Sequence, residues 1–160
     1  MLNSIFIFRL KPSVNENTSC PGRKEIDFFC FDFDKMLKFY QDLGFNYFKT
    51  ETESGSYIDN LVGLKATSIK ITKLKYDESF VIELLKYSKP HSQKTINHDA
   101  NRIGISHIAV DVKSIINMVA LIIKSGGHVI GEIQTSPDKK VKVVYAKDIE
   151  NNIIELVETL

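Results

Sequence analysis

An internal repeat constrains the fold of this 160-residue chain more than any other feature of its sequence. The stretch that begins EIDFFCFDFDKM at Glu25 aligns without a gap with the stretch that begins HIAVDVKSIINM at His107, and the alignment places Gly44 on Gly126. Such self-similarity indicates two copies of one supersecondary unit, each with a hydrophobic face that it cannot bury alone. We therefore expect two modules that pair with each other.

Each copy reads as a strand, a helix and three further strands. An extended run gives way to apolar residues at helical spacing, and alternating apolar runs follow. Asp34 and Ser114 are expected to cap the helix N-termini, and Gly44 and Gly126 to end the helices. The stretch 51–67 leaves room for a short helical turn. Strands are expected over residues 26–31, 45–50, 68–76 and 80–86 in the first copy and 108–112, 128–134, 142–147 and 153–158 in the second.

These patterns predict an α+β fold in which two βαβββ modules pair into a curved mixed sheet around a central cleft. The chain reads as one domain, 1–160. An N-terminal extension covers 1–24, in which residues 5–10 could add an edge strand. The first module covers 25–88, a polar linker covers 89–104, and the second module covers 105–160.

The composition argues against several classes of partner. A net charge of +1 offers no electrostatic case for nucleic acid or a membrane surface. No apolar run approaches the length of a membrane-spanning helix. Cys20 and Cys30 have neither a metal-binding nor a redox spacing, so we expect two free thiols in a reducing cytoplasm.

Two glutamates stand inside apolar strands, Glu83 in FVIELLKY and Glu155 in NNIIELVE. A carboxylate is costly in a strand that is buried on both faces. The repeat gives the two glutamates equivalent positions on the last strand of each module, and it gives Glu25 and His107 equivalent positions at the start of the first strand. If the paired sheets curve around one cleft, these four side chains can converge there and hold a divalent metal ion.

The chain resembles the vicinal oxygen chelate superfamily, which includes glyoxalase I, methylmalonyl-CoA epimerase, extradiol dioxygenases and the bleomycin-resistance proteins. The resemblance rests on KFYQDLGF, FVIELLKY, GISHIAV and YAKDIENNIIELVE, in that order. It implies metal ligands at Glu25, Glu83, His107 and Glu155. Relatives usually have histidine or glutamine where this chain has Glu25, so that residue departs from the family pattern.

Three glutamates around a divalent ion would leave one unit of net negative charge, which weakens a Lewis acid. Oxygen-rich ligation shifts the preference towards Mn²⁺ or Mg²⁺, whereas a set with more imidazole suits Zn²⁺ or Ni²⁺. Three readings of Glu25 stay open. It lies off the metal, it serves as a base, or the chain has left the family's chemistry.

The resemblance implies a metal-dependent lyase or isomerase similar to glyoxalase I or the epimerase. A small substrate would chelate the ion through two adjacent oxygens, and Glu155 or Glu83 would move its proton. A non-catalytic small-molecule-binding module of the bleomycin-resistance kind is the alternative, and an extradiol dioxygenase is a third option. A homodimer is expected, with the modules paired within one chain or across two.

Overall fold

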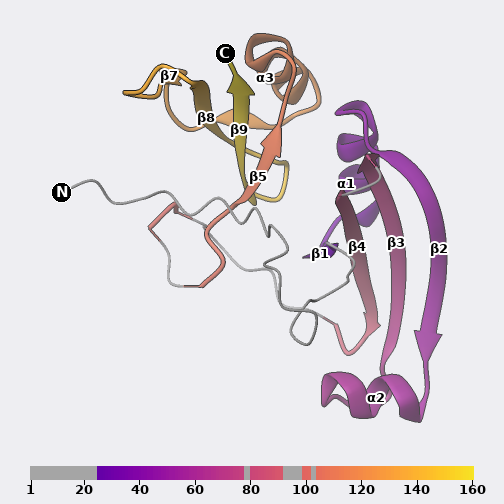
Figure 1. The fold of residues 1–160 in the computed structure, drawn as a ribbon. Coiled ribbons are helices and arrows are strands. Elements are labelled where there is room, and N and C mark those ends of the chain that lie inside the picture. The colour runs from indigo at the N-terminus through magenta and orange to yellow at the C-terminus, as the bar shows by residue number, and fades with distance from the viewer. Residues whose placement is uncertain (1–24, 78–79, 92–98, 102–103) are drawn as a thin grey trace, which may run out of the picture.

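The computed structural model describes residues 25–77, 80–91, 99–101 and 104–160. These residues fold into two βαβββ-like modules, as the repeat predicts (Figure 1). The N-terminal extension with its expected edge strand, Cys20 and most of the linker lie outside the described residues. Within the described part of the chain, no helix is both long enough and apolar enough to cross a membrane.

The first module is a four-stranded mixed sheet with the order β1-β4-β3-β2. The central strand β4 runs parallel to β1 and antiparallel to β3. Helix α1 packs on β4, and the short helix α2 connects β2 to β3. The elements are β1 (Glu25–Phe29), α1 (Phe33–Asp42), β2 (Asn46–Ser54), α2 (Ser56–Val62), β3 (Ser68–Asp77) and β4 (Phe80–Lys89).

The second module repeats this plan with shorter strands. Its sheet has the order β5-β9-β8-β6, and β7 pairs with β8 off that path. The central strand β9 runs parallel to β5 and antiparallel to β8, as β4 does with β1 and β3. The elements are β5 (Ile108–Asp111), α3 (Ile115–Lys124), β6 (His128–Val129), β7 (Gln134–Thr135), β8 (Val141–Lys147) and β9 (Ile153–Thr159).

The structure corrects three details of the sequence-based prediction. The cap of α1 is Asp32 rather than Asp34, because the Asp32 carboxylate accepts the Lys35 N–H and the helix already begins at Phe33. The expected strand 128–134 is two short strands, β6 and β7. The hydrogen-bonded ladders form two sheets, one in each module, rather than one continuous sheet.

The expected helix ends are otherwise confirmed. The Ser114 side chain accepts the Asn117 N–H at the start of α3. Gly44 and Gly126 follow the two helices with φ of +97° and +95°, a left-handed conformation that glycine adopts without steric cost. The excursion between β2 and β3 contains α2, as expected.

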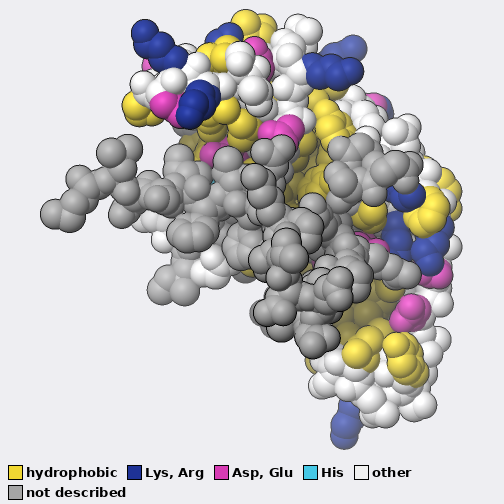
Figure 2. Space-filling view, in the orientation of Figure 1, with side chains coloured by type: hydrophobic (Ala, Val, Ile, Leu, Met, Phe, Trp, Pro, Cys, Tyr) yellow, Lys and Arg dark blue, Asp and Glu magenta, His cyan; other side chains and the backbone are white. Residues whose placement is uncertain are grey.

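The two modules share one hydrophobic core. Helix α1 contributes Met36 and Tyr40, α3 contributes Ile122, and the central strands contribute Leu84 and Leu156, all in one contiguous cluster. Figure 2 shows hydrophobic side chains reaching the surface between the modules. Burial of apolar surface between the modules therefore holds them together, because their buried side chains form one cluster rather than two separate cores.

Polar contacts fix the relative position of the modules. The Tyr40 hydroxyl of α1 donates to the Asp148 carboxylate, which follows β8, at 3.0 Å. The Glu150 carboxylate accepts the backbone N–H groups of Phe31 at 3.0 Å and Asp32 at 2.6 Å. The turn between β8 and β9 is thus tied to the segment that joins β1 to α1.

Candidate functional site

Glu83 lies on the sheet face that points away from the core. Its neighbours Ile82 and Leu84 are completely buried in the core, and successive side chains of a strand point to opposite faces. The register places Glu83 between Asp27 of β1 and Lys73 of β3. Glu83 is still only 7% exposed, so its charge needs a partner.

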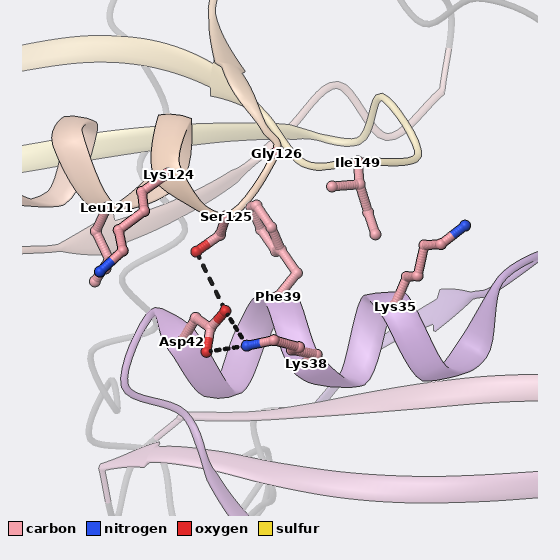
Figure 3. A pocket seen from close by; sticks show the side chains of 9 residues that line it. All are labelled: Lys35, Lys38, Phe39, Asp42, Leu121, Lys124, Ser125, Gly126 and Ile149. Atoms are coloured by element: carbon pink, nitrogen blue, oxygen red, sulfur yellow. Dashed lines mark hydrogen bonds and ion pairs between the residues drawn. The ribbon is translucent and has the colours of Figure 1, made fainter.

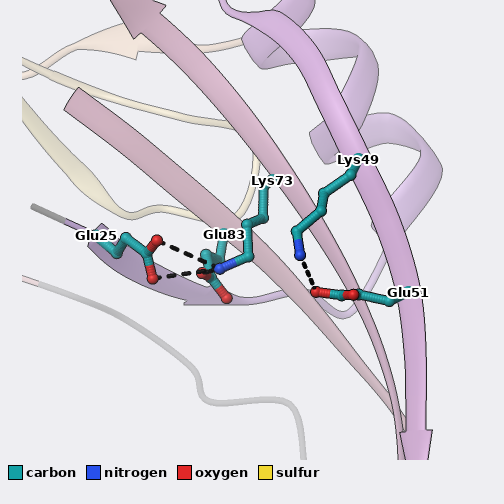
Figure 4. A network of polar contacts seen from close by, with 5 residues as sticks. All are labelled: Glu25, Lys49, Glu51, Lys73 and Glu83. Carbon is teal, nitrogen blue, oxygen red and sulfur yellow. Dashed lines mark hydrogen bonds and ion pairs between the residues drawn. The ribbon is translucent and has the colours of Figure 1, made fainter. Parts of the chain in front are cut away.

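Lys73 is that partner, and it also contacts Glu25. Its Nζ donates to Glu83 Oε1 and lies 3.3 Å from each carboxylate oxygen of Glu25 (Figure 4). Lys73 is itself only 9% exposed. One buried ammonium group therefore bridges the two glutamates that the sequence predicts as the metal ligands of the first module.

The pKa values in this cluster reflect burial and charge together. Burial raises the pKa of Glu83, and the neighbouring Glu25 carboxyl raises it further, while Lys73 opposes the shift. For Lys73, burial alone would lower the pKa, but the pairing with Glu83 and Glu25 outweighs it and leaves the pKa raised. The ammonium form of Lys73 is thus the form that the cluster stabilises.

The second module brings His107 and Glu155 together. Glu155 lies on β9 on the face away from the core and is 2% exposed. His107 comes directly before β5, and its Nε2 lies 3.3 Å from Glu155 Oε2. No assigned hydrogen bond of the described residues reaches Oε2, and His107 Nε2 is the polar atom that faces it. Burial raises the pKa of Glu155, and His107 opposes that shift.

Ser106 lies beside the other ring nitrogen of His107 and bears on which nitrogen carries the hydrogen of the neutral ring. The Ser106 hydroxyl donates its one proton to the Ala100 carbonyl at 3.2 Å and lies 3.0 Å from His107 Nδ1. If that proton stays on the Ala100 carbonyl, the hydroxyl accepts the hydrogen of Nδ1. In that tautomer Nε2 would present a lone pair to the Glu155 carboxylate, and a proton or a cation would fit between them.

The two halves differ at one further position, which the sequence-based prediction missed. Lys73 lies opposite Glu83 across β3 and β4, and Tyr145 lies opposite Glu155 across β8 and β9. The Tyr145 ring packs against the His107 ring with centroids 4.9 Å apart. The repeat could have revealed this pair, because each residue precedes its glutamate by the same interval. Lys73 and Tyr145 thus have equivalent positions in the two modules, but the first is a cation and the second is a neutral aromatic side chain.

The structure brings the four predicted residues together in two pairs, Glu25 with Glu83 and His107 with Glu155. Among the residues that the structure describes, no three His, Cys, Asp or Glu side chains are placed to hold one metal ion. The second pair fits a metal ion in its chemistry, since it offers an imidazole lone pair and an unpartnered carboxylate oxygen. The first pair does not, because the Lys73 ammonium already holds both carboxylates. As arranged, the set of four therefore does not fit one ion.

A cavity of about 550 Å³ lies elsewhere, between α1 and α3 (Figure 3). Phe39, Leu121 and Ile149 provide its apolar lining. Asp42 at its edge pairs with Lys38 at 2.7 Å. None of the four predicted site residues lines this cavity, so its position does not bear on their chemistry.

Paired βαβββ modules, with an acidic residue on the last strand of each, define a glyoxalase-like protein. The chain belongs to the glyoxalase/bleomycin resistance protein/dioxygenase superfamily, whose sequence model it matches over residues 23–156. This confirms the resemblance and the fold class that the sequence predicts. No curated protein sequence matches the chain.

Solved structures agree on the fold. A glyoxalase family protein from Bacillus cereus has a TM-score of 0.81 at 20% identity, with 91% of this chain and 99% of that chain covered. A fosfomycin resistance protein from Listeria monocytogenes, complexed with Mn(II) and sulfate, has a TM-score of 0.57 at 14% identity, with 89% and 95% covered. A glyoxalase/bleomycin resistance protein/dioxygenase domain from Frankia has a TM-score of 0.60 at 17% identity, with 89% and 94% covered.

Proposed function

We propose that this chain is a lyase or isomerase that moves a proton on a small oxygen-rich substrate, with Glu155 as the acid–base group. The observation that carries the proposal is the facing pair of Glu155 Oε2 and His107 Nε2 at 3.3 Å in a buried setting. A buried carboxylate without a hydrogen bond is costly for stability alone, and such groups cluster at functional sites.

The pair of Glu155 and His107 suits proton transfer because Glu155 Oε2 has no assigned hydrogen bond. When the ring is neutral with its hydrogen on Nδ1, two lone pairs face each other, so the pair is a good proton acceptor. Glu155 would take the proton from a carbon next to a carbonyl group, and the electron pair of the broken C–H bond would move to the carbonyl oxygen. Glu155 would then return the proton to the same carbon while the electron pair moves back from the oxygen, which regenerates the carboxylate. Where that carbon carries a hydroxyl group, the hydroxyl proton would pass to the enolate oxygen, the hydroxyl carbon would become the new carbonyl, and Glu155 would protonate the former carbonyl carbon.

Members of this superfamily often bind divalent metals. The ion held by Glu25, Glu83, His107 and Glu155 stays a prediction, and the Lys73 ammonium between the first two counts against it. We therefore derive no catalytic step through a metal ion. Of the two predicted catalytic glutamates, Glu155 is preferred to Glu83, because Glu83 is neutralised by Lys73.

Solvent deuterium exchange tests the proposal. Two kinds of substrate are incubated separately with the protein in D₂O: methylmalonyl-CoA, and adducts of methylglyoxal with thiols. Deuterium at the carbon next to the carbonyl group is then measured by NMR. The wild type is expected to catalyse exchange into at least one of them. Glu155→Gln should lower that rate by about 10²-fold or more, because it removes the proton acceptor and keeps the shape.

Glu132→Gln is the matched control, since Glu132 is an exposed glutamate of the second module. It should exchange at the wild-type rate. If Glu155→Gln also retains the wild-type rate, the assignment of Glu155 as acid–base group is wrong. If the wild type exchanges none of these compounds, proton transfer on them is excluded.

A non-catalytic small-molecule-binding module is the second candidate. The observation that favours it is the ion pairing of Glu25 and Glu83 with Lys73, which engages two of the four polar groups in charge compensation within the protein. In the same NMR experiment, this candidate predicts shifted ligand signals without deuterium exchange. The extradiol dioxygenase option is weaker, because residue 25 is a glutamate where that class uses a second histidine.

The cytoplasmic location, the small-molecule substrate and the homodimer stay predictions. Gel filtration with light scattering checks the homodimer, which requires twice the 18.2 kDa mass of the chain.

A further inference from the structure

In the first module, a lysine side chain contacts both of the glutamates that the sequence predicts as metal ligands. Lys73 stands on the middle of β3, directly opposite Glu83, and its Nζ reaches the carboxylates of both Glu83 and Glu25 (Figure 4). A lysine is among the side chains least often buried unless paired. Its burial here, between two acids, indicates that the cluster is built around the ammonium group.

The charge balance of the cluster explains this arrangement. Two carboxylates that approach the same point repel each other, and the repulsion is strong where water is largely excluded. A single ammonium group that contacts both carboxylates compensates half of that charge. Without Lys73, the two acids would have to take up a proton or a cation from solution.

We infer that Lys73 is a built-in cation that stands where the first module would otherwise hold a divalent metal ion, and that removing its charge uncovers a metal site at Glu25 and Glu83. The ammonium excludes the ion in two ways. It occupies the carboxylate oxygens that would be ligands, and it adds a like charge next to any incoming cation. Carboxylate oxygens are the ligands that Mn²⁺ and Mg²⁺ prefer, so Mn²⁺ is the appropriate probe.

The second module supports the inference by contrast. At the position equivalent to Lys73 it has Tyr145, a neutral side chain that packs against His107. Glu155 there keeps a carboxylate oxygen without a hydrogen-bond partner. Only the first module thus has an internal cation at this position. The inference concerns the site at Glu25 and Glu83, and the proton-transfer proposal concerns Glu155. Either of the two can therefore fail while the other stands.

Titration with Mn²⁺, followed by EPR of the free ion, tests the inference on the full chain. Lys73→Met keeps the length and apolar stem of the side chain and removes the charge. It should bind Mn²⁺ about ten-fold more tightly than the wild type, or better. The gain should disappear in Lys73→Met combined with Glu83→Gln, because one of the two ligands is then lost.

Two control variants isolate the charge of Lys73. Lys73→Arg keeps the positive charge and should gain no affinity. Lys49→Met removes a lysine of the adjacent strand that pairs with Lys73 in the register but forms its ion pair with Glu51 (Figure 4). It should also leave Mn²⁺ affinity unchanged. A gain in Lys49→Met equal to that in Lys73→Met would reduce the effect to overall charge and overturn the inference.

The wild type supplies a test that does not depend on the folding of a Lys73 variant. Because Lys73 already excludes the ion, Glu83→Gln alone should not change Mn²⁺ affinity. If the wild type binds one Mn²⁺ and Glu83→Gln weakens that binding, Lys73 gives way to the ion and the inference is wrong. A folded Lys73→Met, verified by circular dichroism, that gains no affinity overturns it as well.

Discussion

The Ser106 hydroxyl is placed to influence the tautomer of His107. It lies 3.2 Å from the Ala100 carbonyl oxygen and 3.0 Å from His107 Nδ1, and a hydroxyl that donates to the carbonyl accepts from Nδ1. We predict that neutral His107 carries its hydrogen on Nδ1, and that Ser106→Ala lets the ring populate both tautomers. The ¹⁵N chemical shifts of the two ring nitrogens, measured at a pH where the ring is neutral, check this directly.

The ring of His128 serves as the internal reference in those spectra, since it is exposed at the start of β6. Its signals should not change in Ser106→Ala. A wild-type His107 that carries its hydrogen on Nε2 would contradict the prediction, because Nε2 would then donate to Glu155 and the pair would be satisfied.

At this scale the sequence predicted part of the site. The repeat assigned equivalent positions to Glu83 and Glu155 and to Glu25 and His107, and each first-strand residue does lie beside the glutamate of its own module. It did not predict Lys73 as the partner of two acids. A lysine in an alternating strand is normally solvent-exposed, and only the register of β3 against β4 shows that its side chain reaches both carboxylates.

Among the elements, the turn after α3 packs closely against β8 of its own module and against α1 of the other. Gly127 follows this helix, and a Cβ there would lie 2.5 Å from the Lys147 carbonyl oxygen, 2.8 Å from Ile122 Cγ2 and 3.0 Å from Phe39 Cε2. We predict that Gly127→Ala lowers the free energy of unfolding by about 2 kcal/mol or more, because a backbone oxygen cannot move aside as a side chain can.

Gly131→Ala is the matched control for that variant. A Cβ at Gly131 has no atom within 4 Å, so the change should stay within about 0.5 kcal/mol. Urea denaturation of both variants and the wild type gives the comparison. Equal stability of the two variants would contradict the close approach of α3, β8 and α1.

The elements themselves followed from hydrophobic periodicity and glycine punctuation, which are local signals. Helices α1 and α3 and the central strands β4 and β9 lie where apolar spacing predicts them. The split of the expected strand 128–134 was not predictable in the same way. The sequence alternates in this stretch, but the ladder with β8 covers His128–Val129 and Gln134–Thr135, with one further hydrogen bond from the Ile130 N–H to the Tyr145 carbonyl. The break depends on tertiary pairing rather than on propensity.

In the whole molecule, the buried Tyr40–Asp148 contact joins the modules and gives stability a predictable pH dependence. Burial raises the pKa of Asp148 from its usual 3.8, even though hydrogen bonds from Asn152, Glu150 and Tyr40 favour the carboxylate. The folded state therefore binds this proton more readily than the unfolded state. The contribution of Asp148 to stability should fall as the pH rises from about 3.8 through the raised pKa.

Comparison of the wild type with Asp148→Asn isolates that contribution. The difference in unfolding free energy, wild type minus variant, should decrease with rising pH across this window. For Asp138→Asn the same difference should increase with rising pH, at pH values below about 3.8, because hydrogen bonds from Ser136 and Lys140 lower the pKa of Asp138. Slopes of the same sign for both pairs would contradict the assigned directions.

The central claim is that the four predicted residues work as two separate pairs, Glu25 with Glu83 around the Lys73 ammonium and His107 with Glu155 in the second module. Elemental analysis of the protein, purified without a tag or a chelator, tests it most directly. We predict transition-metal content far below one ion per chain, unchanged in Glu155→Ala. One ion per chain that is lost in both Glu155→Ala and Glu83→Ala would contradict the claim, because a single ion would then join the two modules.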